Sequence, residues 1–284
     1  MKVQHFFEAQ TSTLTYVVHD EQTKLGVVID PVLNFDPASG HTSEDACAEV
    51  ARYIDAHALT ISYVLDTHAH ADHLSGMAYF KDRYAARTVI GHHILHVQQR
   101  CRDLYNLGPT FPTDGRQFDT LMRHEEVLAL GALSIKALHT PGHTPACMSY
   151  QISDALFVGD VLFMPDYGTA RCDFPGGSAE VLYDSVQRLY DFPDDTRVFP
   201  CHDYQPGGRP LRWQSTIGEQ RQANVQLNAR TTKEAFIAFR TRRDATLRLP
   251  GLMLPALQVN IRAGRLPEAE NNGITYLKLP LNVF

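Results

Sequence analysis

The chain has 284 residues, of which 44% are hydrophobic, and carries a formal net charge of -6 with a pI near 6.1. This length and composition suit a globular fold with a substantial core and exclude disorder as the main state. The acidic balance offers no basic field for nucleic acid, and no stretch reaches the roughly 18 apolar residues of a membrane span. We therefore expect a cytoplasmic protein that binds neither nucleic acid nor membrane.

The cysteines are odd in number, widely spaced and free of any C-x-x-C pair; they stand at positions 47, 101, 147, 172 and 201. This distribution argues against a disulfide framework and against a structural zinc knuckle. The first residues also lack the basic head and long apolar middle of a signal peptide. We expect reduced thiols.

The first half of the chain alternates strand-like and helix-like segments. Residues 13–32 contain two β-rich runs joined by a polar turn and predict a hairpin. Residues 43–58 have apolar positions at helical spacing, with Ser43 as the expected N-cap. Beyond them the pattern predicts a buried strand at 61–65, a helix at 73–85, a strand at 88–92 and a helix at 93–105. This alternation is typical of layered α/β packing.

The second half predicts consecutive strands within 126–143 and 146–163, broken by two loops, then a helix at 178–192 and a strand at 197–201. Two weaker helical patterns cover 215–228 and 231–246. The remaining tail, 255–284, shows no assignable pattern. No linker divides the chain, so we expect one domain over 1–284, with C-terminal helices and a tail from about 205.

Four predicted strands end in metal-ligating residue types. The first is followed by "DTHAHADHLSG" (66–76), and the others by His143, Asp160 and His202. Rigid strand ends can bring imidazoles and carboxylates to within about 2.0–2.2 Å of an ion. Gly142 and Gly159 each precede a candidate ligand, where a tight turn or a close backbone approach is expected. Five other histidines do not have the spacing of metal ligands relative to these residues, and we expect ordinary structural roles for them: His92, His93, His96, His124 and His139.

The order H-x-H-x-D-H, H, D, H resembles the metallo-β-lactamase superfamily over most of the chain. The resemblance implies a four-layer αβ/βα sandwich, in which two mixed sheets are flanked by helices and a metal site lies in the crevice between the sheets. The segments "THAHADHLSG", "HTPGHTPACMSY", "GDVLFMPDYGTARCDFPGG" and "FPCHDY" are similar to the persulfide dioxygenases and their bacterial β-lactamase-like relatives that detoxify sulfide. The glyoxalase II enzymes share the same ligand positions.

The two resemblances imply different metal arrangements. The persulfide dioxygenases imply one Fe(II) per chain, bound by His68, His143 and Asp160, and two histidines with one carboxylate leave open positions for a sulfur substrate and O₂. The groups that would then orient the ligands and hold water are His70, Asp72, His73 and His202. Glyoxalase II implies two metals, which we take as Zn(II): one bound by His68, His70, His143 and Asp160, the other by Asp72, His73, Asp160 and His202. All seven residues are present, so the ligand set leaves both arrangements open.

The residues around "TARCDF" and "CHDY" suggest substrate contacts. Arg171 suits a glutathione carboxylate by bidentate pairing, or equally an ion pair with Asp173. Cys172 is a candidate to receive or relay a persulfide sulfur, against the alternative of an inert thiol. Tyr204 is a candidate hydrogen-bond donor toward substrate or oxygen, and with Asp72 it is our predicted catalytic pair. Because a strand alternates its side chains, we expect Cys201 to face away from the metal.

The leading hypothesis is an Fe(II)-dependent persulfide dioxygenase, which converts glutathione persulfide or a similar low-molecular-weight persulfide, with O₂ and water, into sulfite and the thiol. The alternative is a dinuclear zinc thioester hydrolase of glyoxalase II type, in which a bridging hydroxide attacks a carbonyl. A non-catalytic metal- or sulfide-sensing protein is a weaker third hypothesis. We expect a homodimer by resemblance, and any sulfurtransferase partner as a separate chain.

Overall fold

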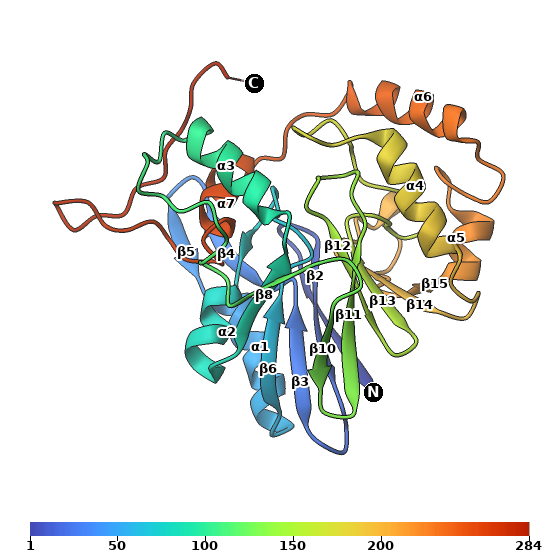
Figure 1. The fold of residues 1–284 in the computed structure, drawn as a ribbon, viewed down its shortest axis with the longest axis horizontal. Helices are drawn as coiled ribbons and strands as arrows, with labels where there is room; N and C mark the ends of the chain where they lie inside the picture. The colour runs from blue at the N-terminus through green and yellow to red at the C-terminus, as the bar shows by residue number, and fades with distance from the viewer. Residues whose placement is uncertain (284) are drawn as a thin grey trace.

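Two six-stranded mixed sheets form the centre of the molecule (Figure 1); the computed structural model describes residues 1–283. The first sheet has the order β1 (Lys2–Glu8), β2 (Thr13–His19), β3 (Leu25–Ile29), β6 (Thr60–Leu65), β8 (Arg87–Gly91) and β9 (Thr120–Met122). Its first three strands pair antiparallel, which confirms the predicted hairpin, and the last four pair parallel.

The second sheet follows in chain order: β10 (Val127–Leu130), β11 (Leu133–His139), β12 (Met148–Ile152), β13 (Ala155–Gly159), β14 (Arg197–Pro200) and β15 (Ser215–Thr216). All its pairs are antiparallel except β13 with β14. A small sheet joins β5 (His41–Ser43), β4 (Val32–Asp36) and β7 (Leu74–Ser75) at the edge of the first layer.

Strands in the middle of both sheets are apolar on both faces because each face is covered. In β3, Val27 points into the core between the two sheets, whereas Val28 points to the outer face. In β13, Phe157 belongs to the same central core, and its neighbour Leu156 faces outward. This two-residue alternation explains why these segments are continuous hydrophobic runs in the sequence.

Helices cover both outer faces (Figure 1). The first sheet is covered by α1 (Asp45–Ala56) and α2 (Met77–Tyr84), with the start of α3 (Ile94–Leu104). The second is covered by α4 (Ala179–Tyr190), α5 (Ile217–Ala223) and α6 (Lys233–Asp244). Ser178 caps α4 by accepting a hydrogen bond from the backbone N–H of Val181. The helix–sheet–sheet–helix order is the predicted four-layer αβ/βα sandwich.

Three local predictions differ from the structure. Ser43 ends β5, and Glu44 is the N-cap residue of α1; the Ser43 hydroxyl bonds the Asp45 carboxylate instead. The segment predicted as helical from 73 begins with β7, and α2 starts only at Met77. The tail that showed no pattern begins inside a helix, α7 (Met253–Asn260), which packs against Leu74. Local periodicity missed β7 and α7 because they are short and are stabilised mainly by contacts distant in sequence.

The cysteines are all buried and free, as their spacing predicted. Within residues 1–283, the structure contains no helix with the length and apolar character needed to cross a bilayer.

Candidate metal centre

Seven candidate ligands lie together at one edge of the two sheets. The loop that carries His68 to His73 follows β6, and His143 lies in the loop after β11. Asp160 follows β13 directly, and His202 follows β14. Because β11, β13 and β14 run in the same direction, their carboxyl ends meet at this edge. The structure therefore confirms that each candidate ligand follows a strand, and the packing of the two sheets brings the strand ends together.

Two glycines let the loops approach one another. Gly159 has φ +54°, and a Cβ there would lie 2.5 Å from Oγ1 of Thr67. Gly142 has φ +140°, and a Cβ there would lie 2.3 Å from Cα of Leu182 in α4. A side chain at either position would push a ligand loop away from its neighbour. This confirms the close approach expected at both glycines.

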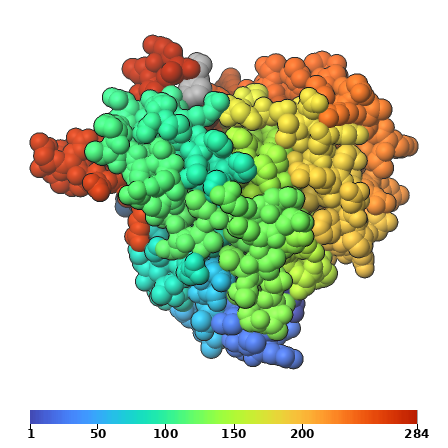
Figure 2. Space-filling view, viewed as in Figure 1, coloured from blue at the N-terminus to red at the C-terminus, as the bar shows by residue number. Residues whose placement is uncertain are grey.

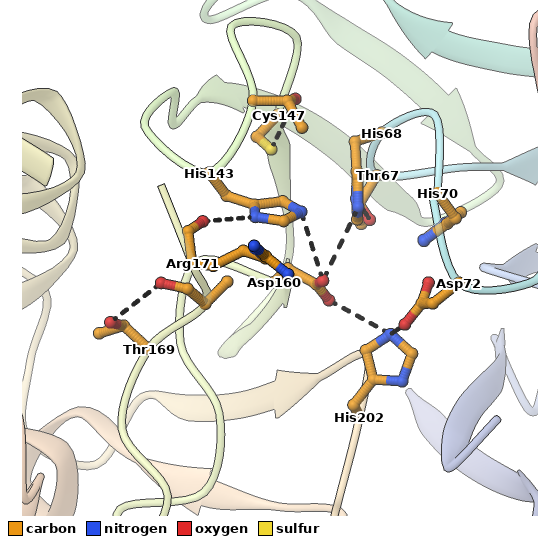
Figure 3. A network of polar contacts seen from close by, with 12 residues as sticks. Thr67, His68, His70, Asp72, His143, Cys147, Asp160, Thr169, Arg171 and His202 are labelled. Atoms are coloured by element: carbon orange, nitrogen blue, oxygen red, sulfur yellow. Dashed lines mark hydrogen bonds and ion pairs between the residues drawn. The ribbon is translucent and has the colours of Figure 1, made fainter. Parts of the chain in front are cut away.

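The carboxylate of Asp160 is the centre of the cluster (Figure 3). Its Oδ2 lies 3.5 Å from Nε2 of His143 and 3.8 Å from Nε2 of His68. Its Oδ1 lies 3.5 Å from Nε2 of His202, and this nitrogen is also 3.1 Å from Oδ2 of Asp72. Asp160 therefore faces two histidines on one side and the His202–Asp72 pair on the other.

These distances define two groups of donor atoms that share Asp160. One donor atom each from His68, His143 and Asp160 lies within 4.8 Å of the other two, and the same holds for Asp72, Asp160 and His202. The first group is two histidines and one carboxylate, as in non-haem iron oxygenases. The second group is a carboxylate-rich neighbour that could hold a second ion or a water network. The geometry thus accommodates one metal or two.

Each histidine facing Asp160 is oriented through its other ring nitrogen. Nδ1 of His143 donates to the carbonyl of Arg171 at 2.8 Å, and Nδ1 of His202 lies 3.2 Å from the carbonyl of Ser12. Nδ1 of His68 lies 3.1 Å from the hydroxyl of Thr67. Hydrogen bonds of this kind set the tautomer and the ring orientation of a ligating histidine and leave Nε2 free for a metal.

His70 is held by a carboxylate that the sequence reasoning did not select. Its Nε2 lies 3.0 Å from Oδ1 of Asp30, which also accepts a hydrogen bond from the backbone N–H of Thr67 at 2.7 Å. Asp30 follows β3 directly, in "VVIDPV". The pattern that could have identified it is an acidic residue at the end of an apolar strand. A second buried carboxyl, Asp66, lies near His70 and Asp30. Burial, followed by the Asp30 charge, raises the pKa of Asp66 well above its usual value.

The donor atoms lack partners within the protein, so the cluster fits a metal ion. The buried polar atoms without a hydrogen-bond partner in residues 1–283 include His68 Nε2, His70 Nδ1, His73 Nε2, Asp160 Oδ1 and His202 Nε2. Leaving several such atoms unsatisfied in a protein interior is costly. A cation bound among them would supply the missing interactions.

Burial sets the charge state of the cluster. It lowers the pKa of His68 well below 6.5, with further lowering from His70 and His143, so the imidazole is neutral and can donate its lone pair. Burial raises the pKa of Asp160 to about 6. Burial alone would lower the pKa of His202, but the Asp72 and Asp160 carboxylates raise it overall. Without a metal, protons therefore compensate part of the negative charge.

Cys201 does not face away from the cluster, contrary to the expectation from strand alternation. Its Sγ belongs to a donor group with His70, His73 and His202, in which the donor atoms lie within 4.8 Å of one another. The reason is that β14 ends at Pro200, so the alternation does not extend to Cys201. Burial and the Asp30 and Asp160 charges raise the pKa of this thiol well above 9, so it stays protonated.

A cavity of about 160 Å³ opens onto this cluster. Asp72, His143 and Asp160 line its inner end, and Tyr204 lines it beside them. The ring of Tyr204 stacks on His202 with the centroids 5.5 Å apart. Tyr204 is 37% exposed, and partial burial together with the two nearby aspartates raises its pKa above 10, so its hydroxyl is a neutral donor. The outer wall comes from the C-terminal third, including Gln226, Arg240 and Arg243 of the α5–α6 region, which the sequence reasoning did not select.

The two predictions in "TARCDF" have different outcomes. Arg171 lines the cavity, but its Nε and Nη2 donate to the Asp173 carboxylate at 2.6 and 2.7 Å, which is the alternative left open above. The predicted substrate contact of Cys172 is not found, because Cys172 does not line this cavity but packs among the side chains beneath α4. Burial raises the pKa of its thiol far above the usual value. A neutral, buried thiol is unsuited to relay sulfur.

Asn260 of α7 fixes the loop of the H-x-H-x-D-H motif. Its Nδ2 donates to the carbonyls of His70 and His73 at 2.8 and 2.9 Å, and its Oδ1 accepts from the N–H of Ser75 at 2.7 Å. The sequence reasoning missed this residue because no local pattern marks it. In contrast, the five histidines expected to have structural roles join none of the donor groups within the described residues.

Comparisons with known proteins agree with this fold. The family profile described as "Metallo-beta-lactamase superfamily" matches residues 10–202. The chain is 48% identical to a probable metallo-hydrolase of Burkholderia pseudomallei over 99% of both chains, and 48% identical to Glyoxylase B2 of Dictyostelium discoideum over 99% of this chain and 97% of the relative. It is 28% identical to the mitochondrial persulfide dioxygenase ETHE1 of Homo sapiens, over 79% of this chain and 75% of the relative.

Among solved structures, ETHE1 from Myxococcus xanthus superposes with a TM-score of 0.75 at 30% identity, covering 93% of this chain and 100% of that one. The chain therefore belongs to the metallo-β-lactamase superfamily. The names of these relatives are a probable metallo-hydrolase, a glyoxylase and a persulfide dioxygenase.

Proposed function

We propose that the protein is an Fe(II)-dependent persulfide dioxygenase. The observation that carries the proposal is the three-residue donor group of His68, His143 and Asp160, from which His70 is absent. Nε2 of His70 pairs with Asp30, and its Nδ1 has no hydrogen-bond partner among residues 1–283 but lies outside this three-residue group. Two histidines and one carboxylate form the ligand set used by non-haem iron oxygenases, and the similarity to ETHE1 proteins agrees with it.

The chain would hold the iron by Nε2 of His68 and His143 and by the Asp160 carboxylate, with His70, His73 and His202 as supporting groups. When bound, the iron supplies the site at which the sulfur substrate and O₂ react. The net reaction consumes one persulfide, one O₂ and one water and yields sulfite and the thiol. His202 and Asp72, 3.1 Å apart, are placed to hold water and move a proton beside Asp160. Tyr204 is placed to donate a hydrogen bond into the cavity.

A second candidate function is favoured by a different observation. Asp72, Asp160 and His202 form a second donor group that shares Asp160 with the first, as a dinuclear hydrolase requires. Two relatives that match nearly the whole chain carry the names metallo-hydrolase and Glyoxylase B2. The alternative is therefore a two-zinc thioester hydrolase of glyoxalase II type.

Metal analysis of anaerobically purified protein, combined with O₂-electrode traces, distinguishes the two. We expect about one iron per chain and O₂ uptake that depends on added glutathione persulfide, with sulfite formed in proportion. Two zinc ions per chain, cleavage of a glutathione thioester and no O₂ uptake would contradict the proposal and support the hydrolase.

A further inference from the structure

A second, apolar cavity lies beside the metal centre. It encloses about 320 Å³, twice the volume of the cavity above the ligands. One wall is formed by α3 and α7, through Val97, Leu104 and Leu257. Arg100 and Asp103 are the charged residues among its lining. We refer to this cavity as the apolar groove. A cavity of this size, lined mainly by hydrocarbon, matches the usual form of a small-molecule site.

The other wall of the apolar groove is made by the metal-ligand loops themselves. Ala69 and Ala71 come from the H-x-H-x-D-H motif, and Thr144 and Pro145 follow the ligand His143. A molecule in the groove would therefore lie against the backs of the loops whose ligands face the metal.

The apolar groove and the metal cavity share part of their walls. Ala71 and Phe174 line both cavities. The Phe174 ring also packs edge-on against the His143 ring, with the centroids 5.3 Å apart. A substrate with its reactive end near Asp160 would reach the groove past the side chain of Phe174, which borders both cavities.

The metal cavity itself offers little to bind a highly charged carrier. Of the three arginines that line it, Arg171 is paired with Asp173 and Arg240 with Asp244. Only Arg243 has no carboxylate within ion-pair distance among residues 1–283. The surface near the candidate metal ligands is therefore mainly apolar and has few unpaired charges.

We propose that the apolar groove binds the organic part of the substrate, so that the preferred substrates are persulfides of thiols with an aliphatic or aromatic group. This inference rests on the proposed dioxygenase function. The sulfur end lies in the 160 Å³ cavity by the metal ligands and the hydrocarbon lies between α3 and α7. Each methylene that enters such a groove leaves water and improves binding about threefold to fourfold.

A series of straight-chain alkyl persulfides tests the proposal. O₂ uptake is measured for the ethyl to octyl compounds, generated in situ, and for glutathione persulfide. We expect kcat/KM to rise about threefold to fourfold per methylene until the groove is full, and to exceed the value for glutathione persulfide. O₂ uptake that does not depend on chain length would overturn the groove proposal alone. No O₂ uptake with any persulfide would contradict the dioxygenase function and, with it, the groove proposal.

A variant that places a charge in the groove gives the second readout. Val97→Arg is expected to abolish the dependence of kcat/KM on chain length. The matched control is Val127→Arg, at an exposed valine of β10, which should leave the whole series unchanged. If Val97→Arg does not fold, Pro175→Trp narrows the groove from an exposed position.

A second copy of the chain is the other occupant that an apolar surface could have. Sedimentation of both variants separates the two occupants. A Val97→Arg protein that changes its oligomeric state but keeps the chain-length dependence would show that the groove is an interface between copies, and would overturn the proposal.

Discussion

Oδ2 of Asp160 lies 3.5 Å from Nε2 of His143, and the other oxygen of the same carboxylate lies 3.5 Å from Nε2 of His202. One carboxylate thus connects the ligands of the proposed iron with the residues that would bind a second metal. Substitutions on either side of Asp160 separate these two uses of the cluster.

Substitutions on the two sides of Asp160 should have unequal effects. His68→Ala removes a proposed ligand and should abolish both bound iron and O₂ uptake. His202→Ala should keep close to the wild-type iron content while activity falls about 10- to 100-fold, the usual cost of losing a supporting group. Metal analysis and O₂ uptake on the same samples measure both. A wild-type protein with two metals, of which His202→Ala loses one, would assign His202 as a ligand.

The stability of the metal-free protein should report the protonation of Asp160. Its pKa is raised by burial from 3.8 to about 6, so between roughly pH 4 and 6 the folded state binds more protons than the unfolded state. The contribution of Asp160 to the free energy of unfolding is therefore fully present below pH 4 and falls as the pH rises through 6.

Asp160→Asn removes this titration. We expect metal-free Asp160→Asn to gain about 2–3 kcal/mol relative to the wild type between pH 4 and pH 7, because the buried carboxylate no longer has to ionise. Urea denaturation at a series of pH values, in the presence of a chelator, gives this difference, which also contains the change in the titration of His202, whose pKa the Asp160 carboxylate raises. A difference that does not change with pH would show that Asp160 is already ionised at pH 4.

Asn260 should matter for metal binding although it lies in the C-terminal third. Asn260→Ala leaves the Ser75 N–H and two buried carbonyls of the motif loop without partners, which we expect to cost about 2–3 kcal/mol of unfolding free energy and to weaken metal retention. The control is Asn272→Ala, at an exposed tail asparagine, which should change stability by less than about 0.5 kcal/mol. Equal metal affinity in both variants would argue against a positioning role for Asn260.

Tyr204→Phe should keep the stacking on His202 and remove only the hydroxyl. If this hydroxyl donates to the substrate, kcat should fall on the order of tenfold, the value of one hydrogen bond, with no change in metal content. Because the pKa of Tyr204 is well above 10, the effect should be constant from pH 6 to 9. Tyr204→Leu, which also removes the ring, is expected to lower metal retention in addition. An unchanged kcat in Tyr204→Phe would contradict hydrogen bonding to the substrate and would show that Tyr204 acts only through packing of its ring.

Cys172→Ala should retain activity within about twofold. The thiol is buried among the apolar side chains beneath α4 and does not line the metal cavity, so we expect only a stability loss of about 1 kcal/mol. Steady-state O₂ uptake and thermal unfolding test this. A large loss of activity in a folded Cys172→Ala protein would restore the sulfur-relay role considered from the sequence.

The motif loop and the tail differ in how well their site residues could be predicted from local sequence. His68, His143, Asp160 and His202 were identifiable because each follows an apolar run that predicts a strand, and a ligand at a strand end is a local signal. The long C-terminal segment carries no comparable periodicity, and it protrudes from the body as the red surface in Figure 2. Asn260 of α7, near the start of this segment, contacts the motif loop although it is 190 residues away from His70 in the chain.

The sequence by itself determined the fold class, the superfamily and a set of candidate metal donors, because hydrophobic periodicity and ligand spacing are properties of neighbouring residues. Only the tertiary structure decided how those donors divide around Asp160, that Nε2 of His70 pairs with Asp30, that Cys172 is buried away from the cavity, and that Phe174 borders both an apolar groove and the metal site. These features depend on which distant segments come into contact, and packing between two sheets and their helices is a property of the whole chain.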